Sequence, residues 1–366
     1  MRKPLILLIS IIVAIAMLCI IFPLDSGKPG FFGVFLWPSS GLKLTGESKS
    51  NYSIRNILKI DDNGSVLTWS VDDKHLYYSK PAQEKGEEGL EELWASDIKG
   101  NIERIDTEVK LYNIENAKWS PDGTILSFVS NHNDIKYLFI FDTSSGIIKD
   151  ITPKKIYDEG VISYNWDDES LNIIMVVDVV NPKIEIYNMR SQKVGKINIH
   201  LNACATAAFY GSKNIIFSDR DSEGFEILKS DISGDNISSI VEGREFVISP
   251  DRNKLVILSD GDSQRGLWLY NIEKNEKKEL LSNPIYNLYW LSDGNNLICS
   301  TVDYLENGQE FPGNIYYMMK DTSIINITGA ARTIFVPTQS GSTIAMSCPQ
   351  SIDDNSKGVF IGEVFR

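Results

Sequence analysis

The stretch that decides the fold is Trp119-Ser120-Pro121-Asp122-Gly123. Ser120 suits the first position of a type I turn, Pro121 pre-sets φ at the second, and Gly123 suits the fourth. Ile114 and Ala117 lead into Trp119, and an apolar run, residues 125–129, follows the turn. The sequence therefore predicts a strand that ends in a large aromatic residue, a tight turn, and a second, buried strand.

Imperfect copies of this unit recur along most of the chain. The residues that anchor them are Trp69, Trp119, Trp166, Phe209, Ile248, Trp290 and Phe335. The copies at Phe209 and Phe335 depart furthest from the pattern. Successive anchors are 39 to 50 residues apart, and a period of that length is typical of a propeller or a solenoid.

Each period also holds a second hairpin. Residues 137–142 alternate aromatic and aliphatic side chains, Ser145-Gly146 supplies a turn, and residues 147–151 form another apolar run. Four short strands in each period indicate a propeller blade. After residue 23 no long stretch has the 3.6-residue periodicity of an amphipathic helix. We therefore expect an all-β, seven-bladed β-propeller.

These residues resemble the TolB-like propeller repeat, which also occurs in the propellers of prolyl-oligopeptidase-type peptidases. The resemblance rests on the Trp-Ser-Pro-Asp-Gly turn, the aliphatic strand after it and the Ser/Asp-rich hairpin. It covers residues 52–366. It implies a binding scaffold whose partner is a protein, a peptide or an envelope polymer.

The last period is one outer strand short. Residues 344–346 and 359–365 have strand character, and the sequence then stops. A missing outer strand would leave an unpaired sheet edge. Residues 53–60 lie just before the first blade and read as a strand. We expect them to complete the seventh blade.

The N-terminus predicts a membrane anchor. Residues 4–22 carry no charge and follow Arg2 and Lys3. As a helix they would span about 28 Å, close to the hydrocarbon core of a bilayer. A cleaved signal is the rival interpretation, although no small-residue cleavage site follows; lipid attachment at Cys19 is a third. We interpret residues 1–22 as an anchor or signal, 23–51 as a linker, and the propeller as extracytoplasmic.

Charge and composition narrow the classes of partner and chemistry. The net charge of −13 argues against nucleic acid as a partner. His75, His132 and His200 have no paired metal-ligand spacing, and no G-x-S-x-G elbow occurs. Residues 219–224 begin like a calcium loop, but Ser230 stands where the loop needs glutamate, so a plain turn is favoured over calcium. We expect no catalytic residues, metal or cofactor.

Three loops between second and third strands are long or acidic. Residues 81–93, 303–314 and 350–358 carry net charges of −4, −3 and −1, and their blades become neighbours when the ring closes. They are either solvated loops or a recognition lip for a basic partner or a cation. The candidate binding residues of that lip are Glu88, Glu91, Glu92, Tyr304, Glu306, Glu310, Phe311 and Arg332.

The sequence thus favours a membrane-anchored, non-enzymatic binding scaffold outside the cytoplasm. Two other classes stay open. One is a hydrolase or lyase with its site in the propeller channel, which converging carboxylates would favour. The other is a sensor or accessory subunit of a membrane complex. A channel lined with aromatic and amide side chains would favour binding.

Overall fold

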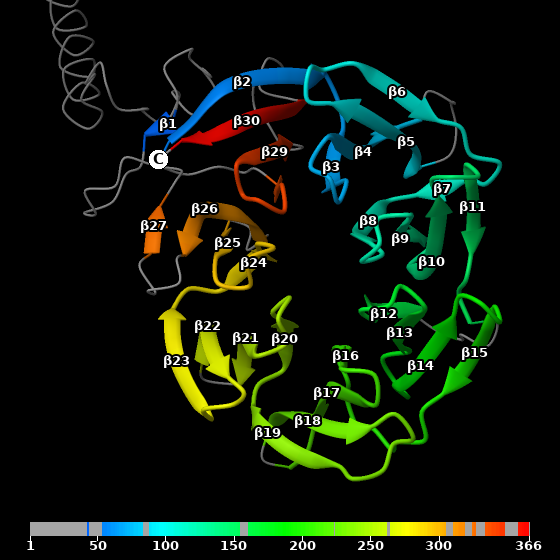
Figure 1. The fold of residues 1–366 in the computed structure, drawn as a ribbon, viewed down its shortest axis with the longest axis vertical. Helices are drawn as coiled ribbons and strands as arrows, with labels where there is room; N and C mark the ends of the chain where they lie inside the picture. Colours follow the sequence, from blue (N-terminus) through cyan, green and yellow to red (C-terminus); the bar gives the residue numbers. More distant parts are fainter. Residues whose placement is uncertain are drawn as a thin grey trace, which may run out of the picture.

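The fold comes from a computed structural model, in which the structure describes residues 42–43, 53–82, 88–153, 160–222, 224–261, 264–304, 310–318, 324–326, 334–347 and 358–365. Within these ranges the strands form seven antiparallel sheets arranged as blades around a central opening (Figure 1). The prediction of an all-β, seven-bladed propeller is confirmed. Residues 1–22 lie outside the described ranges; inside them, no helix is long and apolar enough to cross a membrane.

Each blade has four main strands, which lie side by side in order from the central opening to the rim. The innermost strands are β3 (Ser65–Trp69), β8 (Ile114–Trp119), β12 (Val161–Trp166), β16 (Ala207–Tyr210), β20 (Glu245–Ile248), β24 (Ile285–Trp290) and β28 (Ile334–Pro337). The second strands are β4 (His75–Pro81), β9 (Ile125–His132), β13 (Asn172–Val177), β17 (Asn214–Arg220), β21 (Lys254–Gly261), β25 (Leu297–Tyr304) and β29 (Thr343–Ser347). The predicted anchor residues therefore lie on the innermost strands.

The third and fourth strands build the outer half of each blade. The third strands are β5 (Leu90–Asp97), β10 (Ile135–Asp142), β14 (Lys183–Asn188), β18 (Phe225–Asp231), β22 (Gln264–Asn271), β26 (Glu310–Met318) and β30 (Val359–Phe365). The fourth strands are β6 (Ile102–Ile105), β11 (Ile147–Asp150), β15 (Lys193–Lys196), β19 (Ser238–Glu242), β23 (Glu276–Leu281), β27 (Ile324–Asn326) and, in blade 7, β2 (Ser53–Asp61). A short β7 (Leu111–Tyr112) adds to β5.

The turn that anchors the repeat is held by its own side chains. The Gly123 N–H donates to the Ser120 carbonyl at 2.8 Å, as a type I turn requires. The Ser120 hydroxyl donates to Asp122 at 2.6 Å and accepts the Ile125 N–H at 3.0 Å. Gly123 has φ +73°, and a Cβ there would lie 3.2 Å from Val71 of the preceding blade. Glycine therefore serves both the turn and the packing of adjacent blades.

The tryptophans that end the inner strands connect neighbouring blades. Their indole N–H groups donate from Trp69 to the Val336 carbonyl (3.0 Å), from Trp166 to the Ser127 hydroxyl (2.8 Å) and from Trp290 to the Val247 carbonyl (3.2 Å). Each bond joins a blade to the one before it. Apolar clusters fill the space between adjacent blades, so the core of this protein lies between its sheets.

The atypical fourth copy is reinforced by an arginine from the next blade. Its turn, Tyr210-Gly211-Ser212-Lys213, lacks the usual aspartate. Arg252 of blade 5 donates to the Phe209 carbonyl at 3.0 Å and also pairs with Asp168 of blade 3. A charged hydrogen bond from Arg252 therefore stabilises the inner strand of this atypical copy.

The ring closes through the N-terminal strand, as predicted. β2 pairs antiparallel with β30, with Ile54 opposite Val364 and Ser53 opposite Phe365. β1 (Leu42–Lys43), which lies in the segment interpreted as a linker, adds one more strand to β2. At the far end of β2, Asp61 accepts hydrogen bonds from Tyr78 (3.0 Å) and Lys80 (2.8 Å) of blade 1. Both ends of the propeller sequence are thereby joined.

Candidate functional site: the central channel

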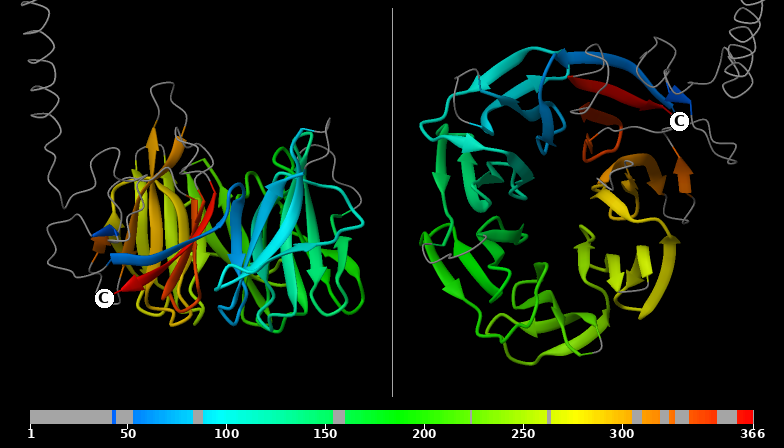
Figure 2. Two further views of the ribbon diagram at one scale, coloured as in Figure 1. Left: turned by 90° about the horizontal axis from the view of Figure 1, so that it is seen from above. Right: turned by 180° about the vertical axis from the view of Figure 1, so that it is seen from behind.

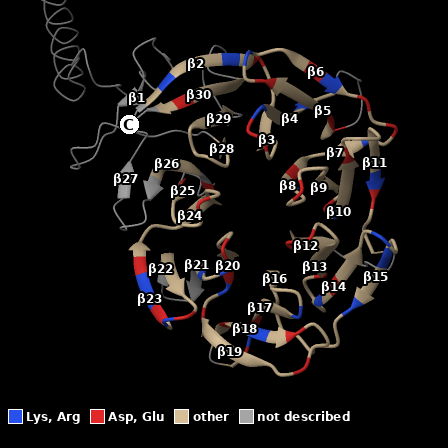
Figure 3. Ribbon diagram, in the orientation of Figure 1, with Lys and Arg blue, Asp and Glu red and all other residues tan. Residues whose placement is uncertain are grey.

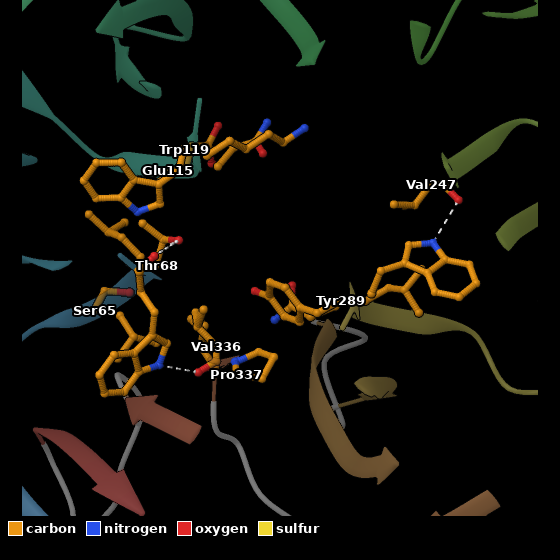
Figure 4. Close-up of a pocket in the computed structure, with 18 of the residues that line it drawn as sticks. Ser65, Thr68, Glu115, Trp119, Val247, Tyr289, Val336 and Pro337 are labelled. Carbon is orange, nitrogen blue, oxygen red and sulfur yellow. Dashed lines mark hydrogen bonds between the residues drawn. The ribbon is translucent and has the colours of Figure 1, made fainter. Parts of the chain in front are cut away.

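The inner strands of blades 1, 2, 5, 6 and 7 enclose a cavity of about 980 Å³ at the centre of the ring. Glu115 and Trp119 of β8 lie on one wall of it, and Tyr289 of β24 lies on another (Figure 4). Val336 and Pro337 of β28 form a third side. The lining combines aromatic, amide and charged side chains, which suits a ligand with both polar and apolar groups.

β-bulges interrupt the pairing of several inner strands. The register of β8 shifts between Glu115 and Lys118, and Asn116 inside the shift has φ +52°. Comparable shifts occur in β3, β12 and β24. The Asn116 carbonyl is fixed by the Tyr164 hydroxyl of blade 3 at 2.5 Å. Bulges re-aim side chains and are frequent at functional sites, and here they present Asn116 to the cavity.

Lys118 is a basic group of the channel wall. Its ammonium donates to the Tyr164 carbonyl at 2.7 Å and to Asn165 Oδ1 at 2.9 Å, and it lies 4.9 Å from the centre of the Tyr164 ring. Within the described part of the chain, no carboxylate lies within ion-pair distance of it. Burial lowers the pKa of Lys118 to about 8. Asn165 continues the network to the Ala207 carbonyl of blade 4 at 2.7 Å.

Trp119 differs from the other inner-strand tryptophans. Its indole nitrogen is buried, and no hydrogen-bond acceptor among the described residues reaches it. The ring packs edge-on against Tyr77 of blade 1, with centroids 5.2 Å apart.

The mouth of the channel carries exposed charged and aromatic groups. Glu115 and Glu245 are exposed, and Tyr286 is 40% exposed. Acidic residues on β8 and β20 border the central opening (Figure 3). Lys136 pairs with Glu115 at 2.7 Å. Because these strands begin opposite the ends of the second strands, this mouth opens on the face that carries the predicted lip.

The structure places the lip residues of blade 1 partly in the loop and partly in the sheet. Glu88 is exposed at the loop. Glu91 and Glu92 lie in β5, because β4 and β5 pair further than the sequence predicted. Glu91 accepts the Ile114 N–H of blade 2 at 2.5 Å, and burial raises its pKa. Glu91 therefore connects two blades.

Glu92 is also bound within blade 1. It accepts hydrogen bonds from Trp94 Nε1 and from the Arg104 guanidinium, both at 3.1 Å. Lys80, which pairs with Asp61, lies 4.5 Å from the Trp94 ring. This network runs over the outside of β4, β5 and β6, so Glu92 has contacts that compete with any partner.

The lip residues of blade 6 are described only in part. Glu310 is exposed and lies opposite Tyr304, and Phe311 lies opposite Asp303, across β25 and β26. The side chains of Tyr304 and Phe311, and all of Glu306 and Arg332, are outside the described residues. Blades 1 and 6 flank blade 7, and their second-to-third strand ends lie on one face (Figure 2).

The sequence did not single out Lys118, Asn116 or Tyr286. A usable signal was present for the first two, since polar residues precede Trp119 in an otherwise apolar inner strand.

In the segment that begins like a calcium loop, Asp219 accepts hydrogen bonds from the N–H groups of Asn202 and Ala203, and Asp221 accepts one from the N–H of Gly224. Both aspartates therefore stabilise the local backbone through these hydrogen bonds.

Comparisons with known proteins show the fold and no family. No family model matches the chain, and no curated protein matches its sequence. The structure is similar to oligogalacturonate lyase from Vibrio parahaemolyticus, with a TM-score of 0.64 and 13% identity over 88% of this chain and 96% of the other. An oligogalacturonate lyase in complex with manganese gives 0.60 and 12% over 89% and 96%.

TolB from Acinetobacter baumannii is also similar, with a TM-score of 0.50 and 15% identity over 69% of this chain and 63% of the other. These identities support a shared propeller fold alone. An enzyme and a TolB protein are both among the similar structures, so the fold does not decide between catalysis and binding. Membership in the TolB-like family stays a prediction.

Proposed function

We propose that this protein is a non-enzymatic binding scaffold whose ligand enters the central channel. The observation that carries the proposal is the mouth, where an exposed Tyr286 and two carboxylates border a cavity of about 980 Å³. An exposed tyrosine supplies contact area at low entropic cost. The bulge at Asn116 adds an amide to the same wall. This combination favours recognition of a polar chain with apolar groups.

The partner is a protein, peptide or envelope polymer that presents a basic segment. Glu88 and Glu310 at the lip give this face a negative field, to which Glu115 and Glu245 at the mouth add less because they pair with Lys136 and Arg244. Such a field speeds encounter with a positive partner and makes the rate salt-sensitive. In the proposal, Tyr304, Glu306, Phe311 and Arg332 complete the lip.

Stopped-flow association with a lysine-rich peptide tests this proposal. Replacing Glu88, Glu306 and Glu310 with glutamine should slow association several-fold at low salt and leave it unchanged at high salt, because salt screens the field. Glu91 and Glu92 are omitted, since their substitution would disturb β5.

The matched control replaces three glutamates at the rim of blade 5, Glu273, Glu276 and Glu279. It removes the same charge away from the mouth, so it should leave the low-salt association rate nearly unchanged. Equal effects of the lip and rim variants would refute a recognition lip.

We place the scaffold outside the cytoplasm on an N-terminal anchor formed by residues 1–22, with residues 23–51 as the linker and 52–366 as a TolB-like propeller. The uncharged run of residues 4–22 supports this. The mature protein should keep its first residues and fractionate with membranes. N-terminal sequencing that starts near Ser26 would show a cleaved signal instead.

The second candidate is an enzyme that acts on a saccharide in the channel. Two observations favour it: the lyases share the fold over nearly their whole length, and Lys118, with its pKa lowered to about 8, would be a competent proton acceptor. Both hydrogen bonds of Lys118 hold the wall together, which favours a structural role. Product formation from oligogalacturonate that disappears in Lys118→Met would establish the enzyme.

A further inference from the structure

A second cavity, of about 540 Å³, lies between blades 2 and 3 near the rim. One side is β11 with residues 151–153 after it, and the other is formed by β14 and β15 (Figure 1). Closer to the axis, Tyr164, Trp166 and Met175 fill the same interface with apolar contacts. The rim cavity is therefore a local opening between two blades and is separate from the central channel.

Glu185 lines this cavity, and one of its carboxylate oxygens has no hydrogen-bond donor among the described residues. Glu185 is on β14, and this oxygen, Oε2, is buried. Burial raises the pKa of Glu185, while Lys183 and Lys196 act in the opposite direction. A buried acceptor without a donor is costly in free energy. A ligand that donates a hydrogen bond to Glu185 would explain why a glutamate stands at this position.

The other wall offers donors. Lys149 Nζ donates to Gln192 Oε1 at 2.7 Å and lies 3.5 Å from the Tyr187 hydroxyl. The described residues place no carboxylate within ion-pair distance of Lys149. Thr152 also lines the cavity, and Ile151 and Val194 add apolar surface. The cavity thus combines a free acceptor, an ammonium, a hydroxyl and apolar patches.

We propose that this cleft, defined by Lys149, Thr152, Glu185, Tyr187 and Gln192, binds a small neutral polyhydroxylated ligand, a saccharide unit. A sugar hydroxyl both donates and accepts, so one ring satisfies Glu185 and Lys149 together. The apolar patches fit the C–H face of the ring. Lys149 in the cavity and Lys183 and Lys196 near Glu185 disfavour a cation, and the carboxylates of Glu185 and Asp150 disfavour an anion.

Ligand-observed saturation-transfer NMR on the full chain tests the proposal. The probes are D-glucose, D-galactose, D-mannose and N-acetyl-D-glucosamine, with ethanolamine as the cationic alternative. We expect transfer to at least one sugar, and an affinity at least tenfold weaker in Glu185→Met. Transfer to none of the four sugars, transfer to ethanolamine alone, or unchanged transfer in the variant would overturn the proposal.

A melting temperature gives a second, independent readout. Glu185→Met replaces an unpaired buried acceptor with an apolar side chain of similar length, so the unliganded protein should melt at a higher temperature. Glu226→Met, at a half-buried glutamate on the third strand of blade 4, is the matched control and should not raise it. A lower melting temperature in Glu185→Met would show that the carboxylate is satisfied within the protein, and the inference would fail.

Discussion

A chain truncated to begin at residue 62 will be far less stable than one that begins at residue 50. The shorter chain lacks β2, so β30 loses its outer partner along residues 53–61. It also uncovers the space filled by Ile54, which is completely buried against Leu291, Ile298 and Phe335. Burial of such a side chain contributes about 1.5–3 kcal/mol, and each lost ladder hydrogen bond about 0.5–1.5 kcal/mol.

Together these losses approach the whole stability of a typical domain, about 5–15 kcal/mol. We therefore expect thermal unfolding, followed by circular dichroism, to shift to a much lower temperature or lose its cooperative transition. Ile54→Ala in the full chain should reproduce part of the loss, about 2–5 kcal/mol. Equal melting temperatures for the two truncated chains would contradict closure by β2.

The second large effect is a rise of stability with pH that depends on Lys118. Burial holds its pKa at about 8 in the folded protein, against 10.5 for the ordinary group. Between these values the unfolded chain binds a proton that the folded chain lacks, so the free energy of unfolding increases with pH. The full difference in pKa corresponds to about 3 kcal/mol of unfolding free energy. This value is an upper limit, because the Lys118 side chain borders a channel that water can enter.

Chemical denaturation between about pH 8 and 10 measures this rise. Lys118→Met should remove it, and Lys136→Met, at a half-buried lysine of the same channel that pairs with Glu115, should keep it. Higher pH is unsuitable, because the raised pKa values of Tyr78, Tyr164 and Tyr289 work in the opposite direction once tyrosines ionise. The same pH dependence in wild type and Lys118→Met would refute an uncompensated lysine in the wall.

The fold was predictable because its signals are local. The turn at Ser120 and Gly123 is built from hydrogen bonds within five residues, so a short stretch of sequence is enough to predict it. Ring closure was predictable for a different reason. A last period that is one strand short leaves an edge, and the stretch at Ile54 was available to cover it.

The candidate site was less predictable, because it depends on contacts between blades. Asn116 faces the channel through a bulge whose carbonyl is held by Tyr164, 48 residues away. Glu91 and Glu92 looked like loop carboxylates, yet extended pairing of β4 with β5 places them in a sheet. The ion pair between Arg252 and Asp168 joins residues 84 positions apart in the sequence, and no local sequence pattern predicts it.

Equilibrium titration of the full chain with the lysine-rich peptide, followed by mass spectrometry of the recovered peptide, tests the central claim most directly. A binding scaffold should give saturable binding, at least tenfold weaker in Tyr286→Ala and unaffected by Ile237→Ala at an exposed site on blade 4. The recovered peptide should keep its mass. Cleavage of the peptide, absence of binding, or equal affinity for Tyr286→Ala and wild type would contradict a non-enzymatic site at the mouth of the channel.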